Sequence, residues 1–173
     1  MDQSKLQFCS ALRPSEHLRA LVQSEEADMA SLPSDEAIVT GGEDWPDAYR
    51  MTPVLPEHSE ACVVAFWHHQ WGCPAFQLYS GMLFGLPAAV TAFNRYSKLC
   101  EMLVRRTVAV PFSMYFDDAN FQDWKSSGGS AQTATNDLMK LLGTPFAEVK
   151  RQNLSSKADF LGLEHDTSRA LSE

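Results

Sequence analysis

The stretch Tyr115-Phe116-Asp117-Asp118 decides the fold that we predict, because it places two adjacent carboxylates inside a long apolar run. The apolar residues are Val108, Ala109, Val110, Phe112 and Met114 before the pair, and Ala119, Phe121 and Trp124 after it. Asp is depleted in strands and favoured in turns, so the pattern predicts a β-hairpin with Asp117 and Asp118 at its tip. Hard oxygen donors at such a tip suit Mg²⁺, which proteins usually hold with one or two carboxylates and substrate phosphates.

Length and composition indicate one globular domain. The chain has 173 residues, of which 45% are hydrophobic and 21% are charged, and it can bury a core of ordinary size. No apolar run approaches the roughly 20 residues of a membrane span, and the N-terminus does not resemble a signal peptide. The irregular spacing of Cys9, Cys62, Cys73 and Cys100 fits reduced thiols. We therefore expect an intracellular protein without a membrane partner, and nucleus and cytoplasm both stay open.

The charge is acidic and unevenly spread. The formal net charge is −8, and residues 1–44 carry nine acids against three bases, whereas residues 45–173 carry thirteen acids against eleven bases. A complete nucleic-acid enzyme normally has a basic groove. The balance argues against tight nucleic-acid binding by this chain alone.

Period and turn signals predict the elements on either side of the Asp pair. The first 36 residues form an acidic segment with a helix expected over residues 15–29. We then expect a short strand over residues 37–40, a flexible joint at Gly41-Gly42, a hairpin of strands 62–67 and 75–80, and a long helix over residues 89–104.

After the Asp pair, we expect a helix capped by Ser130 that carries Ala134, Leu138, Leu141 and Leu142 and stops at Gly143. Short strands over residues 146–149 and 159–163 follow. The sequence from Glu164 is polar and we expect it to be frayed, with residues 167–173 as a polar tail beyond the domain. This order predicts an α+β fold, an antiparallel sheet with helices packed on one face.

Five ordered segments of the chain form a recognisable series. They are Asp44–Arg50 (DWPDAYR), Leu83–Arg95 (LFGLPAAVTAFNR), Tyr115–Asp118 (YFDD), Gly143–Gln152 (GTPFAEVKRQ) and Phe160–Asp166 (FLGLEHD). In this order they resemble the successive palm motifs of reverse transcriptases, most closely those of retrotransposons, with YFDD in the place of the YxDD motif. The second segment departs from the family pattern, because Leu83 and Val90 stand where the family usually has proline. The resemblance implies a polymerase palm-like domain over residues 37–166.

The same resemblance implies the activity of an RNA-directed DNA polymerase, a nucleotidyltransferase. Asp44, Asp117 and Asp118 are then the catalytic acids and the ligands of Mg²⁺ or Mn²⁺, because two-metal nucleotidyl transfer needs carboxylates that converge from neighbouring strands. The implied partners are an RNA or DNA template with a DNA primer, and deoxynucleoside triphosphates. A solvated turn is the ordinary explanation of an isolated Asp-Asp pair, and the other four motifs argue against it here.

Four further residues are implied to bind the nucleotide. Tyr49 stands where the family has an aromatic ring beneath the incoming sugar, although a plain core tyrosine is the alternative. Phe84 and Gly85 resemble the turn that lies against the nucleotide, where glycine permits close backbone approach. Lys150 is a candidate to neutralise or protonate the pyrophosphate, and a solvated lysine on an edge strand is equally consistent with its position.

Residue clusters outside the five motifs give weaker evidence for a functional site. The cluster of Cys62, His68, His69 and Cys73 matches no regular zinc pattern, and Asp159 reads as an ordinary surface acid. A basic fingers region and a thumb, which reverse transcriptases also have, are not apparent in the sequence. We therefore expect the isolated chain to be an inactive palm that needs the remaining segments of a longer polyprotein. A non-catalytic relic that keeps the fold and binds nucleic acid or Mg²⁺ is the alternative.

Overall fold

The computed structural model describes residues 37–169, so the expected acidic segment with its helix over residues 15–29 lies outside the described residues. The contacts divide the chain into two compact units. The first holds the described residues up to Pro46 and those from Ser97 onward, and the second runs from Asp47 to Tyr96. Within residues 37–169, no helix combines the length and the apolar composition that crossing a membrane requires.

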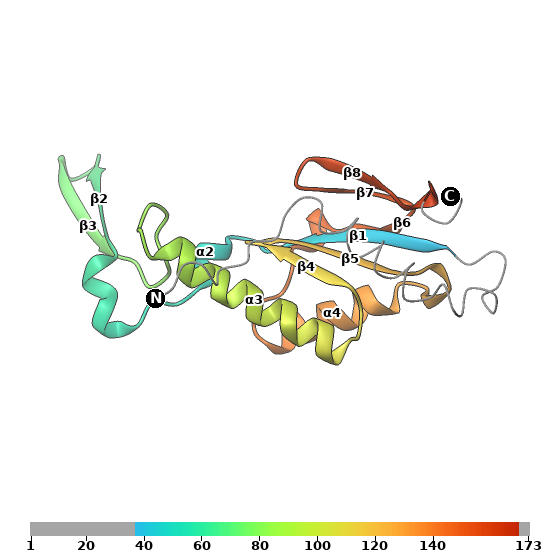
Figure 1. Ribbon diagram of the computed structural model, residues 1–173. Coiled ribbons are helices and arrows are strands. Elements are labelled where there is room, and N and C mark those ends of the chain that lie inside the picture. Colours follow the sequence, from blue (N-terminus) through green and yellow to red (C-terminus); the bar gives the residue numbers. More distant parts are fainter. Residues whose placement is uncertain (1–36, 170–173) are drawn as a thin grey trace. The chain divides into compact units, whose positions relative to one another are not determined.

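A four-stranded antiparallel sheet is the centre of the first unit (Figure 1). The strand order is β4 (Phe112–Tyr115), β5 (Asp118–Trp124), β1 (Ile38–Asp44) and β6 (Gln152–Ser155). β1 and β5 pair without interruption, from Ile38 opposite Trp124 to Asp44 opposite Asp118. The predicted α+β fold with a palm-like antiparallel sheet is confirmed.

The glycine pair that we expected to be a flexible joint lies inside β1. A Cβ atom added to Gly41 would lie 2.8 Å from the Gln152 carbonyl oxygen of β6, so glycine permits this close approach of two strands. The Asn120 side chain donates to Thr40 Oγ1 at 3.1 Å and to the Gly41 carbonyl oxygen at 2.9 Å. The expectation of a joint was wrong because cross-strand partners fix these residues.

Helix α3 (Ala89–Thr107) confirms the long helix expected from its period, and its C-terminal part lies with α4 (Ser130–Leu141) on one face of the sheet (Figure 1). Arg105 Nε donates to the Phe112 carbonyl oxygen at 2.6 Å, and the Met114 amide donates to Glu101 Oε2 at 3.1 Å. The core of this unit includes the buried side chains of Ile38, Val104, Phe112, Met114, Phe121 and Met139.

The buried face of α4 differs from the expected one. Its buried residues are Ala131, Gln132, Thr135, Asn136 and Met139, whereas Leu141 is 83% exposed. The N-cap is Gly129, and Ser130 is the first helical residue rather than the cap. The helix ends before Gly143, whose φ of 78° is the left-handed conformation expected of a terminating glycine.

The C-terminal part contains a separate hairpin in place of the two expected strands. β7 (Lys157–Phe160) and β8 (Leu163–Asp166) pair around a turn at Leu161 and Gly162, and this hairpin packs beside β1 (Figure 1). Residues 146–149 are not a strand, because Phe146 stacks on Trp45 and Glu148–Lys150 forms a 3₁₀ turn. The expected fraying is also wrong at Thr167, whose buried hydroxyl donates to the Ile38 carbonyl oxygen at 2.6 Å.

The second unit contains the short helix α2 (Ala48–Met51), a 3₁₀ helix (Pro56–Ala61) and the hairpin of β2 (Val63–His68) and β3 (Cys73–Leu78). This hairpin confirms the two strands expected after residue 61, with boundaries shifted by one or two residues. Large apolar side chains of the hairpin are exposed, among them Trp67 (54%) and Phe76 (71%).

Candidate active site

The Asp-rich turn between β4 and β5 lies beside the end of β1. Phe116 and Asp117 form the turn, with Phe116 in the left-handed region (φ 52°), and Asp118 is the first residue of β5 rather than part of the tip. Ser97 Oγ donates to the Phe116 carbonyl oxygen at 2.6 Å, and the Trp45 amide donates to the Asp117 carbonyl oxygen at 3.1 Å. These bonds hold the turn against α3 and β1.

Asp44 and Asp118 are direct cross-strand partners. Burial, more than any other cause, raises the pKa of Asp118 to about 6, and the charges of Asp117 and Asp44 add to the effect. A side-chain hydrogen bond with Asp44 raises the pKa of Asp118 further, as the smallest of the causes. The pKa of Asp117 is raised as well, first by burial and less strongly by Asp44, while a backbone hydrogen bond opposes the shift. The three acids therefore form one electrostatic group.

Lys150 supplies a cation to this group. Its Nζ atom lies 2.7 Å from Asp44 Oδ2, and this hydrogen bond is the main reason that the pKa of Lys150 is raised. The Ala147 amide donates to the Asp44 carbonyl oxygen at 2.8 Å, which fixes the segment carrying Lys150 to the end of β1. Lys150 ends a 3₁₀ turn and does not lie on an edge strand, while its side chain is 58% exposed, as the alternative of a solvated lysine expects.

A cavity of about 310 Å³ adjoins these groups. It is lined by Glu43, Asp44, Asp118, Ala119, Lys150, Gln152, Asp159, Phe160, Leu161 and Gly162. The structure thus places Asp44, Asp118 and Lys150 around one space, to which the turn of the β7–β8 hairpin contributes. Asp159, interpreted from the sequence as an ordinary surface acid, belongs to the same lining.

Asp44 and Asp118, which are cross-strand partners, carry carboxylate oxygens. Oxygen donors of this type are the ones that Mg²⁺ takes in proteins, usually one or two carboxylates with water or phosphate in the other positions. Across residues 37–169, no three His, Cys, Asp or Glu side chains form a ready-made ligand group. Neither the three acids Asp44, Asp117 and Asp118 nor the Cys and His side chains between Cys62 and Cys73 form such a group.

The sequence analysis missed a buried polar cluster at Glu43, the residue before Asp44. Glu43 Oε1 accepts hydrogen bonds from Arg151 Nε at 2.7 Å, Asn136 Nδ2 at 2.8 Å and Gln132 Nε2 at 3.0 Å. The signal that could have revealed it is the pairing of two consecutive acids, Glu43 and Asp44, with two consecutive bases, Lys150 and Arg151.

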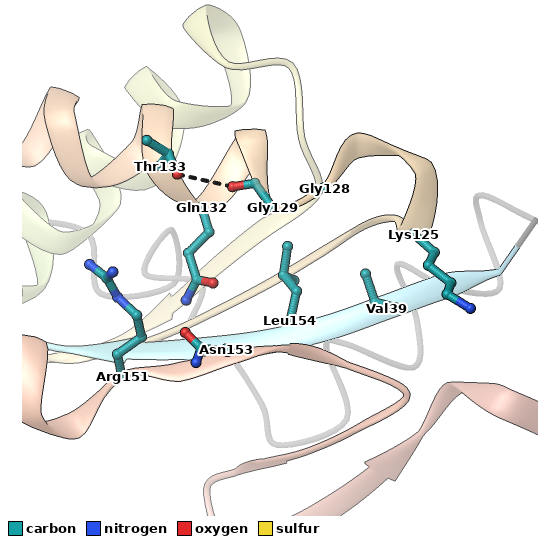
Figure 2. Close-up of a pocket in the computed structure, with 9 residues that line it drawn as sticks. All are labelled: Val39, Lys125, Gly128, Gly129, Gln132, Thr133, Arg151, Asn153 and Leu154. Atoms are coloured by element: carbon teal, nitrogen blue, oxygen red, sulfur yellow. Dashed lines mark hydrogen bonds between the residues drawn. The ribbon is translucent and has the colours of Figure 1, made fainter.

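A second cavity, of about 340 Å³, lies between the start of α4 and the edge of the sheet. Figure 2 shows Gln132 reaching from α4 toward the strand segment that carries Arg151 and Asn153. Gln132 Nε2 also donates to the Gln152 carbonyl oxygen at 3.1 Å. This contact joins α4 to β6 beside the Glu43 cluster.

Comparison with solved structures reveals the same architecture in viral polymerases. The foamy viral protease-reverse transcriptase in complex with dsDNA matches with a TM-score of 0.53 and 14% sequence identity over 73% of this chain. The same kind of protein in complex with RNA/DNA hybrid matches with a TM-score of 0.55 and 15% identity, again over 73%. The chain has a reverse-transcriptase-like fold. It covers 24% and 16% of the two viral chains.

No family model and no curated protein sequence matches the chain. Within the reverse-transcriptase-like fold, the predicted nucleotide-binding residues Tyr49, Phe84 and Gly85 belong to the second unit. The Tyr49 ring is 7% exposed and packs against Phe84 at 4.5 Å and Phe93 at 4.6 Å between ring centroids. Phe84 is 76% exposed, and Gly85 has a φ of 88°. The Tyr49 ring is therefore packed between two aromatic rings, as the alternative of a core tyrosine also expects.

Proposed function

We propose that the chain is the palm region of a retrotransposon-type RNA-directed DNA polymerase. The observation that carries this proposal is the pairing of Asp44 with Asp118 at the end of β1 and β5, beside Asp117, in a reverse-transcriptase-like fold. Side chains from two antiparallel strands there supply the carboxylates that nucleotidyl transfer requires.

The chemistry follows from the roles of these side chains. Asp44, Asp117 and Asp118 would hold Mg²⁺ or Mn²⁺ ions, which when bound activate an attacking hydroxyl and stabilise a leaving oxygen. Burial, and to a lesser degree the charges of the neighbouring carboxylates, raises the pKa values of Asp117 and Asp118, so a divalent cation bound there would relieve an unfavourable concentration of negative charge. Lys150, paired with Asp44, can neutralise or protonate the departing pyrophosphate.

The proposed substrates are deoxynucleoside triphosphates, with a primer on an RNA or DNA template. The Tyr49 ring, packed between two aromatic rings, would exclude a 2′-hydroxyl, and Phe84 and Gly85 would lie against the nucleotide. The complexes with dsDNA and RNA/DNA hybrid among the similar structures support a nucleic-acid partner. Because the chain spans only 24% of one neighbour's length, we propose that fingers and thumb come from other segments of a longer polyprotein.

A non-catalytic relic is the second candidate. It is favoured by the net charge of −8, which opposes binding to phosphates, and by the ion pair that already satisfies Asp44 Oδ2. The two candidates differ in whether metal binding at the three acids leads to polymerisation.

Metal binding is tested by thermal unfolding with and without Mg²⁺ or Mn²⁺. A ligand at a hundred times its dissociation constant adds about 2.7 kcal/mol to the free energy of unfolding, so the midpoint should rise for the wild type. The variants Asp117→Asn and Asp118→Asn should lose this rise in midpoint. The control variant Asp137→Asn, which replaces an exposed acid of α4, should keep it. An unchanged wild-type midpoint, or an equal rise in Asp118→Asn, would show that the acids form no metal site.

Polymerisation is tested in a longer protein that contains this domain with fingers and thumb. Asp117→Ala there should abolish primer extension, because a metal ligand acts directly on transition-state charge. Tyr49→Ala should keep extension and accept ribonucleotides more readily. Extension that survives Asp117→Ala would refute the assignment of the acids, and metal binding without extension in any longer protein would favour the relic.

A further inference from the structure

Two consecutive acids of β1 are matched one to one with two consecutive bases. Asp44 Oδ2 lies 2.7 Å from Lys150 Nζ, and Glu43 Oε1 lies 2.7 Å from Arg151 Nε. The two pairs differ in environment, because the Lys150 side chain is 58% exposed whereas the Glu43 side chain is 0% exposed. The buried pair of Glu43 and Arg151 can therefore adopt fewer side-chain conformations than the exposed pair of Asp44 and Lys150.

The surroundings of Glu43 are built for one arrangement. Asn136 and Gln132, both on the buried face of α4, donate to the oxygen that also accepts from Arg151. The second carboxylate oxygen, Oε2, is buried and has no hydrogen-bond partner among the described residues. A buried ion pair with an unsatisfied oxygen contributes little net stability compared with apolar residues of similar size, so stability does not explain it.

The buried pair of Glu43 and Arg151 has another effect. It decides which of two neighbouring cations, Lys150 or Arg151, lies beside Asp44. Arg151 directly follows Lys150 in the chain, and its planar guanidinium matches a carboxylate better than the lysine ammonium does, so Asp44 is the acid for which it would compete without Glu43. Such a pairing would leave Lys150 away from the acids. The amide donors of Gln132 and Asn136 fix the Glu43 carboxylate where it captures Arg151, and Lys150 is then the cation beside Asp44.

We propose that Glu43 is a positioning residue, which holds Arg151 on the buried side of β1 so that Lys150 faces Asp44. The inference rests on the proposed function only in the use that it gives to Lys150. In the full chain, Glu43→Gln releases Arg151, which then takes Asp44 and displaces Lys150. Replacing both members of the buried pair by leucine removes the competitor, so Lys150 returns to Asp44.

The test is the rate at which the Lys150 amine reacts with acetic anhydride, measured by mass spectrometry relative to Lys157 in the same protein. An amine held against a carboxylate reacts more slowly than a released one. We expect a two- to fivefold increase in Glu43→Gln, the range that an exposed ion pair permits. Glu43→Leu with Arg151→Leu should return to within about twofold of the wild type on the same scale. The matched control is Glu148→Gln, an exposed acid of the same 3₁₀ turn, which should leave the rate unchanged.

An unchanged rate in Glu43→Gln would overturn the proposal. An equal increase of the Lys150 reaction rate in the single and the double variant would also overturn it. A general loosening of the structure around Lys150, without competition from Arg151, predicts that result. If Glu43→Gln does not fold, nuclear magnetic resonance of the wild type tests whether the buried pair of Glu43 and Arg151 forms in solution. The Arg151 Nε proton should exchange with water at least about tenfold more slowly than that of the exposed Arg50, since it is bonded to a buried carboxylate. Equal exchange rates would mean that the buried pair does not form.

Manganese binding by the same variants separates this inference from the proposed function. Glu43→Gln should weaken Mn²⁺ binding, because arginine then competes for Asp44, and the double leucine variant should restore it. A wild type that binds no Mn²⁺ would refute the metal site but leave the lysine reactivities to decide the role of Glu43. Normal Mn²⁺ binding with unchanged Lys150 reactivity in Glu43→Gln would refute the positioning role alone.

Discussion

At the scale of single residues, the protonation of Asp118 depends on the fold. Its pKa of about 6 compares with about 3.9 for an unperturbed aspartate, so the folded chain binds the proton more tightly than the unfolded chain does. Asp118 therefore stabilises the folded state, and the full contribution is present when the pH is below the pKa of the unfolded chain. The contribution is lost as the pH rises through about 6.

The resulting prediction is a fall in the free energy of unfolding between pH 4 and pH 7. After a discount for solvent screening of this half-buried group, we expect about 1 kcal/mol from Asp118. Urea unfolding across this pH range should show a flatter curve for Asp118→Asn than for the wild type. Asp137→Asn is the control and should keep the wild-type slope. A wild-type curve parallel to that of Asp118→Asn would mean that the carboxylates are not crowded in solution.

At the scale of elements, α4 shows how a partner can override an apolar pattern. Leu141, its last residue, and Leu142, its C-cap, are both exposed, whereas Gln132 and Asn136 are buried against Glu43. A buried polar side chain needs a hydrogen-bond partner, and Glu43 supplies it. The helix is therefore oriented by a buried carboxylate as well as by Met139.

We predict opposite results for two apolar truncations in α4. Met139→Ala should lower the free energy of unfolding by about 2–5 kcal/mol, because the side chain is fully buried. Leu141→Ala, two residues further on, should change it by no more than about 0.5 kcal/mol because that side chain is 83% exposed. Chemical unfolding of the two variants measures both values. A larger loss for Leu141→Ala would show that α4 packs by its apolar pattern after all.

The hairpin of β2 and β3 is an element of a different kind. No Asp, Glu, Lys or Arg occurs between Glu60 and Arg95, and nearly all of the strand residues are exposed. A two-stranded hairpin has marginal stability without a packed face. Its hydrogen bonds should therefore open more easily than those of the central sheet.

Hydrogen exchange tests this expectation. Amides of Val63–His68 and of the residues of Cys73–Leu78 other than Pro74 should exchange at least about a hundredfold faster than those of β1 and β5, which form the buried sheet. The paired amides of α3 provide an internal reference within the same sample. Protection of the hairpin equal to that of β1 would indicate that another part of the chain, or a second copy, covers it.

At the scale of the whole molecule, charge sets the interaction with nucleic acid. With a net charge of −8, the chain offers few phosphate contacts, so we predict that it binds duplex only weakly at physiological salt and extends a primer undetectably. Titration of a labelled primer-template at two salt concentrations measures the affinity. Tight binding with a steep salt dependence, or robust extension by the 173-residue chain, would contradict this prediction.

The sequence by itself determined the elements whose signals are local. Turn chemistry predicted a hairpin with its tip at Asp117 and Asp118, one residue beyond the observed turn, and the end of α4 before Gly143, and the period of apolar residues predicted α3. The ordered motifs led to the reverse-transcriptase-like fold that the solved structures share at 14–15% identity. These features depend on residues within a few positions of one another, so a linear pattern contains them.

Only the tertiary structure decided what depends on distant partners. Gly41 lies within β1 because β6, more than a hundred residues later, approaches its backbone. Residues 146–149 form no strand because Phe146 packs on Trp45, and α4 buries its polar side because of Glu43. Burial and hydrogen bonding between segments so far apart leave no period in the sequence. Their partners are set by the three-dimensional arrangement of β1, α4 and the segment that carries Lys150 and Arg151.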